Sequence, residues 1–325
     1  MALPRSLLIA NRGEIAIRVA RTARSLGIRS VAIHPEDDGA SLHTRVADHA
    51  VMLAGRGSAA YLDIDAVVAA AVAAGCDAVH PGYGFLSESA VFASACSAVG
   101  VTFVGPTPDQ LSLLGDKARA REAAVAAGLP VLRGSDGPVD TDGAVAFRRS
   151  LVADGSDGAI MLKAVAGGGG RGMRVVRTEA DVADAFARCS SEALAAFGDG
   201  CIYVEELLPI ARHIEVQIVG DGVSVMHLGE RDCSVQRRHQ KLIEIAPAPN
   251  LSDERRERLH DDAVRLAQSV GFQNIGTIEF FVALGRRHSP CTREESFGCQ
   301  RCAGRPPAFT DRSHDVASGH AGLVE

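Results

Sequence analysis

The sequence predicts an α/β fold in which an open parallel sheet covered by helices is followed by a second lobe. Short apolar runs alternate with segments of helical period through residues 6–105, and each helical segment ends at a glycine. Such alternation is typical of βαβ units and therefore of a parallel sheet. The length of 325 residues, with 46% apolar content, suffices for about two domains.

The first βαβ unit is the most regular. Residues 6–10 form an apolar run of strand length. Residues 14–27 carry apolar side chains at helical spacing and end at Gly27, and residues 30–33 resume the strand pattern. We therefore expect a strand, a helix and a second parallel strand.

The same pattern recurs twice before residue 106. Helices are predicted over residues 63–75 and 87–100, with strands following at 77–80 and 101–105. Functional residues are expected in the loops after such strands. The first of these turns, ANRGEIA, lacks the G-x-G-x-x-G spacing, so it supports a dinucleotide site only weakly.

The second lobe is predicted from a mixture of helices and hairpins. A helix runs from near Asp116 to Gly128, and the turn formers of residues 133–143 indicate a boundary between lobes. Ser252 is a plausible N-cap for a later helix that stops at Gly271. The remaining predicted elements are strands at 159–165, 173–177, 201–208 and 276–284, a helix at 179–197 and a hairpin over 213–232.

Four consecutive glycines, residues 167–170, lie between two apolar runs. Glycines at a hairpin tip can close over phosphates, because backbone N–H groups approach the oxygens without Cβ atoms in the way. Lys163 precedes the glycines on a strand, whereas in a P-loop the lysine follows them into a helix. The loop is thus interpreted as a phosphate-binding loop of another kind, with a flexible linker as the alternative.

Lysine is scarce in this chain. Of the 34 basic residues only Lys117, Lys163 and Lys241 are lysines, and the others are arginines. A coding bias explains the replacement on solvated surfaces, but a guanidinium does not replace a compact ammonium among phosphate oxygens. A shared site for the three lysines is therefore the hypothesis, and chance placement is the alternative.

Composition excludes several classes of protein. A net charge of −6 gives no general attraction to nucleic acid or an anionic membrane. No apolar stretch reaches the ~18 residues of a membrane span, and the eight cysteines are too dispersed for a disulfide framework. We expect a cytoplasmic protein with reduced thiols, no membrane partner and no nucleic-acid partner.

Several long motifs resemble one family. IANRGEIAIRVARTARSLG, HPGYGFLSE, LKAVAGGGGRGMRVV, ERDCSVQRRHQK and GTIEFF occur in the order seen in biotin carboxylases, the ATP-grasp subunits or modules of acyl-CoA, pyruvate and related carboxylases. The resemblance covers residues 1–282. It implies an N-terminal Rossmann-like (pre-ATP-grasp) parallel sheet over residues 1–115, followed by an incomplete ATP-grasp fold over residues 116–284.

The resemblance implies a ligase activity. ATP and bicarbonate, with Mg²⁺ or alternatively Mn²⁺, would form carboxyphosphate, whose carboxyl group passes to the ureido nitrogen of protein-linked biotin. No biotin-attachment motif surrounds any of the three lysines, so biotin would arrive on another domain or chain. The implied partners are a biotin carboxyl carrier domain and a carboxyltransferase, with a homodimer for the complete fold.

The resemblance also assigns roles to residues. Lys117 and Lys163 would contact nucleotide phosphates, Gly169 and Gly170 would belong to the loop that closes over them, and Lys241 would contact bicarbonate. Glu279 would be one of the magnesium-binding carboxylates. The adenine segment would be Glu205, Glu206, Leu207 and Leu208, and the polar lining of the nucleotide and reaction site would be His213, Gln236 and His239.

Within that set, Lys241, His239 and Gln236 are the candidates for catalytic roles. Outside the family context, His213 or His239 would more often be structural or merely solvated. Glu279 between apolar residues would be interpreted as an edge or outward-facing strand position.

The resemblance stops within the last predicted strand. After Leu284 the family continues into a segment of the form E-x-N-x-R-x-Q-V-E-H, which carries a second metal carboxylate, the catalytic arginine and the proposed base, and this sequence lacks it. Residues 285–325 are expected to form a non-family, disordered tail, since residues 286–325 contain few apolar residues and no periodicity. An out-of-frame reading or a damaged gene would explain the change.

The tail also has an alternative interpretation as a zinc site. Cys299 and Cys302 have C-x-x-C spacing, and further thiol and imidazole groups are present at Cys291, His288, His314 and His320. No second paired motif completes the site, so accidental cysteines are favoured.

Two functions therefore remain open for the chain. It is either a biotin carboxylase module whose carboxylation is impaired by the missing segment, or a non-catalytic ATP-binding remnant of one. Another ATP-grasp ligase, such as half of a carbamoyl-phosphate synthase, would explain the glycine loop but not HPGYGFLSE together with ERDCSVQRRHQK.

Overall fold

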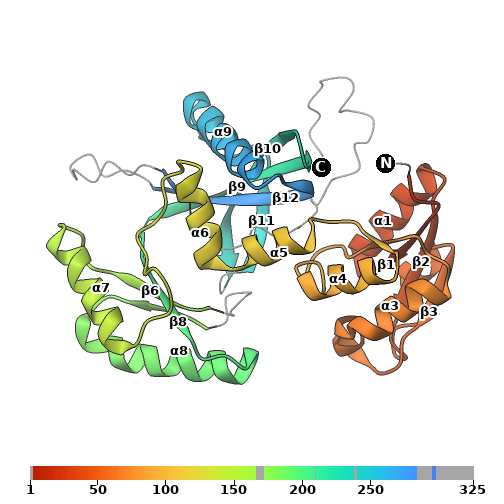
Figure 1. The fold of residues 1–325 in the computed structure, drawn as a ribbon, viewed down its shortest axis with the longest axis horizontal. Coiled ribbons are helices and arrows are strands. Elements are labelled where there is room, and N and C mark those ends of the chain that lie inside the picture. Colours follow the sequence, from red (N-terminus) through yellow and green to blue (C-terminus); the bar gives the residue numbers. More distant parts are fainter. Residues whose placement is uncertain (1–2, 166–171, 209, 238–239, 284–294, 298–325) are drawn as a thin grey trace. The chain divides into compact units, whose positions relative to one another are not determined.

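The computed structural model describes residues 3–165, 172–208, 210–237, 240–283 and 295–297 (Figure 1). These residues divide into two compact units, one up to Gly105 and the other from Pro106 onward. Among the described residues, no helix is long and apolar enough to cross a membrane.

The first unit is the predicted parallel sheet. Its strands lie in the order β3-β2-β1-β4-β5, and all neighbours are parallel. Ile15 and Val19 of the first helix pack with Ile9 of the first strand in one apolar core. The elements are β1 (Ser6–Ile9), α1 (Gly13–Ser25), β2 (Arg29–His34), α2 (Leu42–Val46), β3 (His49–Met52), η1 (Gly57–Leu62), α3 (Ile64–Ala73), β4 (Ala78–His80), α4 (Ala90–Ala98) and β5 (Thr102–Phe103).

The second unit contains two sheets. The larger has the order β11-β10-β9-β12-β13 and is antiparallel, and a helix, α9, packs against its β9–β10 hairpin. Leu259 and Leu266 of that helix share a core with Ile214, Val216 and Ile218 of the sheet. The elements are α5 (Pro108–Gly115), α6 (Lys117–Ala126), β9 (Ala211–Asp221), β10 (Val225–Arg237), β11 (Gln240–Ile245), α9 (Asp253–Ser269), β12 (Gln273–Ala283) and β13 (Glu295–Phe297).

The smaller sheet of this unit has the order β7-β6-β8. The strands before and after the glycine loop, β6 and β7, pair antiparallel as the sequence predicts. Leu151, Ile160 and Val182 belong to the core between this sheet and its helices. The elements are α7 (Thr141–Ala153), β6 (Ile160–Ala164), β7 (Met173–Val176), η2 (Glu179–Asp181), α8 (Val182–Phe197) and β8 (Ile202–Glu206).

The predicted helix signals act where expected in α9. The Ser252 hydroxyl accepts a hydrogen bond from the N–H of Arg255 at 3.4 Å, which satisfies one of the orphan donors of the first turn. Gly271 adopts φ 56° just after the helix, a left-handed conformation that glycine tolerates best.

Two turn-rich stretches contain more structure than predicted. Helix α7, which was not predicted, begins at Thr141 with Asp140 as its N-cap. Helix α2 and strand β3 were not predicted either, because the spacing of apolar residues in these two segments has no helical or strand period.

The C-terminal stretch is described only in part. Glu295–Phe297 form the short strand β13, which pairs antiparallel with β12 through Phe280↔Phe297. Regular structure was not expected at these three residues. The other tail residues, with their cysteines, lie outside the described residues, so the prediction that they are disordered stays a prediction.

A close backbone approach fixes the end of the β9–β10 hairpin. Gly220 pairs with both Val225 and Asn274, so it lies between two neighbouring strands. A Cβ atom at Gly220 would lie 2.3 Å from the carbonyl oxygen of Phe272, which is backbone and cannot move aside as a side chain can. The sequence therefore needs glycine here for space.

We predict that Gly220→Ala lowers the free energy of unfolding by about 1–3 kcal/mol, because the added methyl group forces β9 away from the residues before β12. Urea unfolding followed by circular dichroism measures the change. Gly137→Ala is the matched control, since a Cβ atom there meets nothing within 4 Å. Equal stability of both variants would show that the hairpin end is not tightly packed.

Candidate functional site

A pocket of about 190 Å³ in the second unit collects most of the expected nucleotide residues. Both sheets of the unit contribute to it. The residues that line it are Leu132, Met161, Lys163, Met173, Glu205, Glu206, Leu207, Leu208, His213, Gln236 and Phe281. Its apolar side chains and few convergent polar groups are typical of a site for a ligand with a flat apolar part.

Lys163 forms an ion pair with Glu205 at this pocket. The two side chains are only 3% and 8% exposed. Strand pairing explains why they meet: Lys163 lies opposite Tyr203 and Met161 opposite Glu205, so Lys163 and Glu205 are diagonal neighbours on one face of the β6–β8 pair. The ion pair fixes the position of the Lys163 side chain at the wall of the pocket.

The backbone N–H groups at the end of β8 and directly after it are already engaged. The N–H of Glu206 donates to the carbonyl of Arg133 at 2.8 Å, and that of Leu207 to the carbonyl of Ala159 at 3.0 Å. A base bound here would therefore have to use carbonyl oxygens of the segment or the N–H of Leu208.

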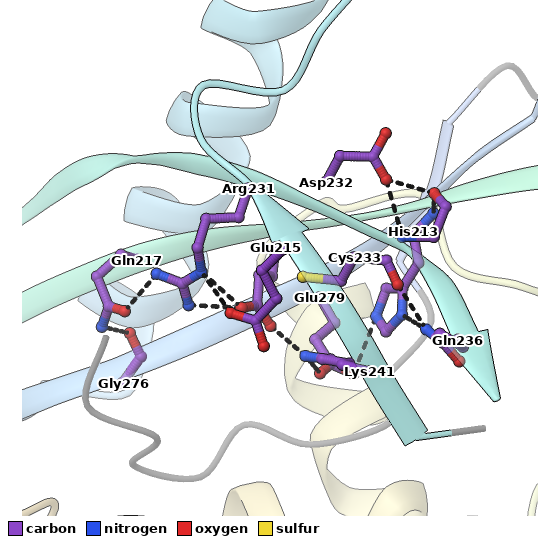
Figure 2. A network of polar contacts seen from close by, with 12 residues as sticks. His213, Glu215, Gln217, Arg231, Asp232, Cys233, Gln236, Lys241, Gly276 and Glu279 are labelled. Carbon is purple, nitrogen blue, oxygen red and sulfur yellow. Dashed lines mark hydrogen bonds and ion pairs between the residues drawn. The ribbon is translucent and has the colours of Figure 1, made fainter. Parts of the chain in front are cut away.

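A network of buried charges lies beside the pocket (Figure 2). Lys241 donates hydrogen bonds to Glu215 and to Glu279, the latter at 2.7 Å. Arg231 donates to Glu215 through Nε at 2.8 Å and to the side-chain oxygen of Gln217 at 3.0 Å. The Glu215 side chain is fully buried, and those of Lys241, Arg231 and Glu279 are at most 13% exposed.

The antiparallel register assembles this network. His213, Glu215 and Gln217 alternate along β9, so their side chains lie on one face of the sheet. Glu279 of β12 lies opposite Glu215, and Arg231 of β10 lies opposite it on the other side. Three adjacent strands therefore bring their polar residues to one strip of the sheet.

Electrostatics keep the two carboxylates of the strip ionised. Burial alone raises the pKa of Glu279, but the hydrogen bond with His213 and the charge of Lys241 together bring it down to about 2. Burial likewise raises the pKa of Glu215, and the charges of Lys241 and Arg231 lower it further than burial raises it. Burial lowers the pKa of Lys241, but Glu279 and Glu215 raise it above the ordinary value.

His213 connects the strip to the pocket. Its Nδ1 lies 2.7 Å from Nε2 of Gln236, and its Nε2 lies 3.3 Å from a carboxylate oxygen of Glu279. The imidazole is thus positioned between the Gln236 amide and the Glu279 carboxylate. The ring also stacks on Phe281 with centroids 5.3 Å apart.

Two places among the described residues could offer carboxylate oxygens to a divalent cation. Glu215, Cys233 and Glu244 lie within 4.8 Å of one another, but Glu215 already binds two cationic side chains, and burial and then Glu215 raise the pKa of the Cys233 thiol. A neutral thiol in that position does not fit Mg²⁺. Glu279 fits better, since Mg²⁺ is commonly held by one or two carboxylates together with substrate phosphates.

The outcome for the predicted site residues is mixed. The structure brings Lys163, Glu205, Glu206, Leu207, Leu208, His213 and Gln236 to one pocket, with Lys241 and Glu279 in the adjoining strip. The backbone of Lys117 begins α6, and its side chain is outside the described part. Gly169, Gly170 and His239 lie outside the described residues. The expectation that an isolated Glu279 would face outward is wrong, because the side chain is buried.

Sequence reasoning missed Glu215, Gln217 and Arg231. A partial signal was present, because HIEVQIV at residues 213–219 alternates polar and apolar side chains, and the structure buries all of residues 213–218. Polar residues at every second position of a buried strand require partners, which is the pattern of a buried polar strip.

Comparison with known proteins identifies the family. The family model described as "Biotin carboxylase, N-terminal domain" matches residues 4–111, and "Carbamoyl-phosphate synthase L chain, ATP binding domain" matches residues 116–289. Mitochondrial pyruvate carboxylase of Mus musculus is 49% identical over 289 residues, which are 87% of this chain and 24% of that protein. The chain thus spans about a quarter of the length of that curated relative.

Two solved structures show the same fold. A biotin carboxylase–β-γ-ATP complex from Campylobacter jejuni has a TM-score of 0.85 and 42% identity, covering 94% of this chain and 66% of that one. The biotin carboxylase domain dimer of Hydrogenobacter thermophilus 2-oxoglutarate carboxylase, with MgADP and bicarbonate, has a TM-score of 0.82 and 42% identity, covering 87% of this chain and 62% of that one. The chain belongs to the biotin carboxylase family and carries that family's N-terminal and ATP-binding domains.

Proposed function

We propose that this chain binds ATP with a divalent cation and takes part in the carboxylation of protein-linked biotin by bicarbonate. The observation that carries the proposal is the adjacency of the Lys163–Glu205 pocket and the buried strip around Lys241. The relatives support it, since the C. jejuni structure is described as a nucleotide complex and the H. thermophilus structure as a complex with MgADP and bicarbonate.

In this proposal Lys163 contacts the nucleotide phosphates. Its ammonium is held by Glu205 on one side, and the adjoining pocket is lined by Met161, Met173 and Leu132, which suit the flat adenine ring. Glu205, Glu206, Leu207 and Leu208 hold the base. Gly169 and Gly170 close over the phosphates with Lys117, and His213, Gln236 and His239 complete the polar lining.

Lys241 is proposed to contact bicarbonate. An ammonium has three N–H donors, and among the described residues two of them are used by Glu215 and Glu279. The third remains for an anion. Because the neighbouring carboxylates favour the charged ammonium, Lys241 offers a fixed positive charge near the expected phosphates.

The chain's residues stabilise charge rather than form bonds. Phosphoryl transfer depends mainly on positioning and on neutralising the oxygens of the transferred group. Glu279 stays ionised and is oriented by Lys241 and His213, so it is the described carboxylate suited to Mg²⁺, or alternatively Mn²⁺. When bound, that cation would supply the neutralising charge at the phosphates.

The wider assembly is part of the same proposal. Biotin would be presented by a carboxyl carrier domain on another part or another chain, and a carboxyltransferase would use the product. The domain division proposed is residues 1–115, 116–284 and a tail over 285–325. The family matches over residues 4–111 and 116–289 support the first of these two boundaries. A homodimer is proposed for the complete fold on the example of the H. thermophilus dimer.

A second candidate function is ATP binding without carboxylation. The observation that favours it is the sequence after Leu284, which lacks an E-x-N-x-R-x-Q-V-E-H segment and with it a second carboxylate, an arginine and a base. In that case the pocket binds nucleotide, and carboxyphosphate formation is impaired.

We predict that Lys163→Ala and Lys163→Arg both weaken ATP binding about 10- to 150-fold, measured by calorimetry. A charged hydrogen bond contributes about 1.5–3 kcal/mol, and the larger guanidinium does not fit a side-chain position that is 3% exposed. Arg149→Ala is the control, since it removes an exposed cation paired with Glu179 in the same lobe. Because Lys163→Ala leaves the buried Glu205 carboxylate without its cation, the double variant Lys163→Met/Glu205→Gln is measured too. Unchanged ATP affinity in Lys163→Ala, in Lys163→Arg and in the double variant would exclude a contact between Lys163 and the nucleotide phosphates.

We predict that Lys241→Met lowers the free energy of unfolding by about 3–5 kcal/mol at pH 7, because two buried carboxylates lose their shared cation. Adding Glu215→Gln should recover part of the loss. Glu279 has a folded pKa of about 2 against an ordinary 4.5, so its stabilisation of the parent chain is complete above pH 4.5 and declines below it. The gap between parent and Lys241→Met should therefore narrow in urea unfolding at pH 4. A gap independent of pH would contradict this account.

The two candidate functions separate in one comparison. Biotin-dependent ATP cleavage with bicarbonate and Mg²⁺ is measured on the 325-residue chain and on an extended chain, in which the residues after Leu284 are replaced by the corresponding C. jejuni biotin carboxylase segment through to its C-terminus. We expect turnover lower by several orders of magnitude in the 325-residue chain, since each lost charge-stabilising group typically costs 10²–10³ in rate. Comparable turnover would refute impairment, and activity in neither chain would refute the proposed carboxylation.

A further inference from the structure

Strand β10 carries a β-bulge where it borders the pocket. From Asp232 to Val235 this strand advances by three residues, while the residues opposite them on β11 are two apart. An extra residue in one strand of an antiparallel pair re-aims the side chains that follow it. A second shift comes directly after the first and places Gln236 opposite Lys241.

The bulge decides which face of the sheet Gln236 occupies. Arg231 and Cys233 both lie beside Glu215 in the buried strip. Side chains alternate along a regular strand, so Gln236 would then lie on the other face of the sheet, against which α9 packs. Instead its Nε2 atom lies 2.7 Å from Nδ1 of His213, at the pocket (Figure 2). The extra residue therefore brings Gln236 to the face of the strip.

Asp232 and Ser234 hold the bulge in place. The Asp232 carboxylate accepts hydrogen bonds from the N–H of Ser234 at 2.8 Å and from its hydroxyl. A carboxylate that binds the N–H two residues further on stabilises a local turn, here within a strand. The Ser234 hydroxyl accepts in turn from the N–H of His213 at 2.9 Å, next to Ile214, where the pairing of β9 with β10 ends. A side chain thus replaces the strand partner at the point where the ladder stops.

A buried arginine fixes Asp232. Arg212 donates to its carboxylate through Nε at 3.0 Å and through Nη2 at 2.7 Å, and both side chains are at most 15% exposed. The same guanidinium donates to the carbonyls of Pro249 at 2.5 Å and of Asn250 at 3.2 Å. Burial raises the pKa of Asp232, but the hydrogen bonds from Ser234 and Arg212 bring it below its ordinary value. The bulge is therefore anchored, through an ionised carboxylate, to the segment that follows β11.

We propose that Asp232 and Ser234 are positioning residues of the pocket, because they hold the bulge that aims Gln236 at His213 and through that contact set the affinity for the bound nucleotide. The statement about the nucleotide rests on the proposed function, and the statement about the orientation of Gln236 does not. Gln236 also donates to the carbonyl of Cys233 at 2.9 Å, within the bulge itself. Its side chain therefore keeps this direction only while the bulge persists.

The side-chain amide of Gln236 reports its own position without ATP. Its signal in a proton–nitrogen NMR correlation spectrum of the 325-residue chain is identified as the one that Gln236→Ala removes. We expect Ser234→Ala and Asp232→Ala to move this signal toward that of a solvent-exposed glutamine, because the amide leaves the carbonyl of Cys233 and the ring of His213. An unmoved signal in both variants overturns the proposal.

Conservative variants and a variant with an exposed side chain keep this measurement decisive. Ser234→Thr retains the hydroxyl and Asp232→Asn retains a side-chain oxygen, so both should leave the Gln236 signal in place. Loss of the original signal in both conservative variants counts against the proposal. Since Ser234 is exposed, Ser234→Ala decides alone if Asp232→Ala does not fold.

Asp221→Ala is the matched control. At the other end of β9 the Asp221 carboxylate likewise accepts from two backbone N–H groups, those of Val223 at 2.9 Å and Ser224 at 2.7 Å. Its loss should leave the Gln236 signal unchanged. A shift of that signal in the control would show that a general loosening of the sheet moves the side chain, which overturns the proposal.

Calorimetric titration with ATP tests the effect on the ligand. We expect Ser234→Ala to weaken ATP binding about 3- to 10-fold, the range of one neutral hydrogen bond, and Asp221→Ala to leave it unchanged. In a Gln236→Ala chain the further change Ser234→Ala should add nothing, since both act through one contact. Additive effects of the two changes overturn the proposal, and so does unchanged ATP affinity in Ser234→Ala.

Failure of the proposed function gives a different result. A parent chain that binds no ATP rejects that function, and the Gln236 signal then decides whether Asp232 and Ser234 position the side chain. A signal that moves in Ser234→Ala but not in Asp221→Ala supports the positioning role in that case. A signal that stays in place rejects the positioning role as well.

Discussion

The second unit depends on one interaction, the contact of Lys241 with two carboxylates on neighbouring strands. Glu215 and Glu279 lie opposite each other on β9 and β12. Directly opposed like charges destabilise a sheet, and here they are also buried. Lys241 from β11 and Arg231 from β10 offset that cost, so four strands are connected through one strip of charges. The register of the sheet therefore determines which charges meet in the site, and the contacts between those charges in turn stabilise that register.

The sequence predicted those elements whose apolar period was strong and whose ends had chemical signals. Strands β1 and β2, with α1 between them, and helix α9 with its Ser252 cap, follow from local pattern alone. Strand β3 and helix α2 were missed because their short sequences mix polar and apolar residues without a period. Strand β11 was missed for a physical reason, since its charged residues, Lys241 and Glu244, are three positions apart and its sequence therefore lacks the period-two alternation of a half-buried strand.

The site residues that belong to recognisable sequence motifs were predicted, and those outside such motifs were not. Lys163, His213 and Gln236 were found through the resemblance, and the pocket brings them together. Glu215 was not found, because a carboxylate on a buried strand has no local signal that names its partners. Those partners come from β10 and β11 through antiparallel register, which is a long-range property. Composition gave an independent indication, since lysine in an arginine-rich chain was retained at Lys163 and Lys241, both buried against carboxylates.

Strand β11 joins the site to the surface. Lys241 can stay between Glu215 and Glu279 only while its strand keeps its position against β10, and that pairing contains two register irregularities. An edge strand paired on one side is held less firmly than an interior strand. The position of the Lys241 ammonium, and with it the electrostatics of the strip, therefore depends on how firmly β11 stays paired with β10.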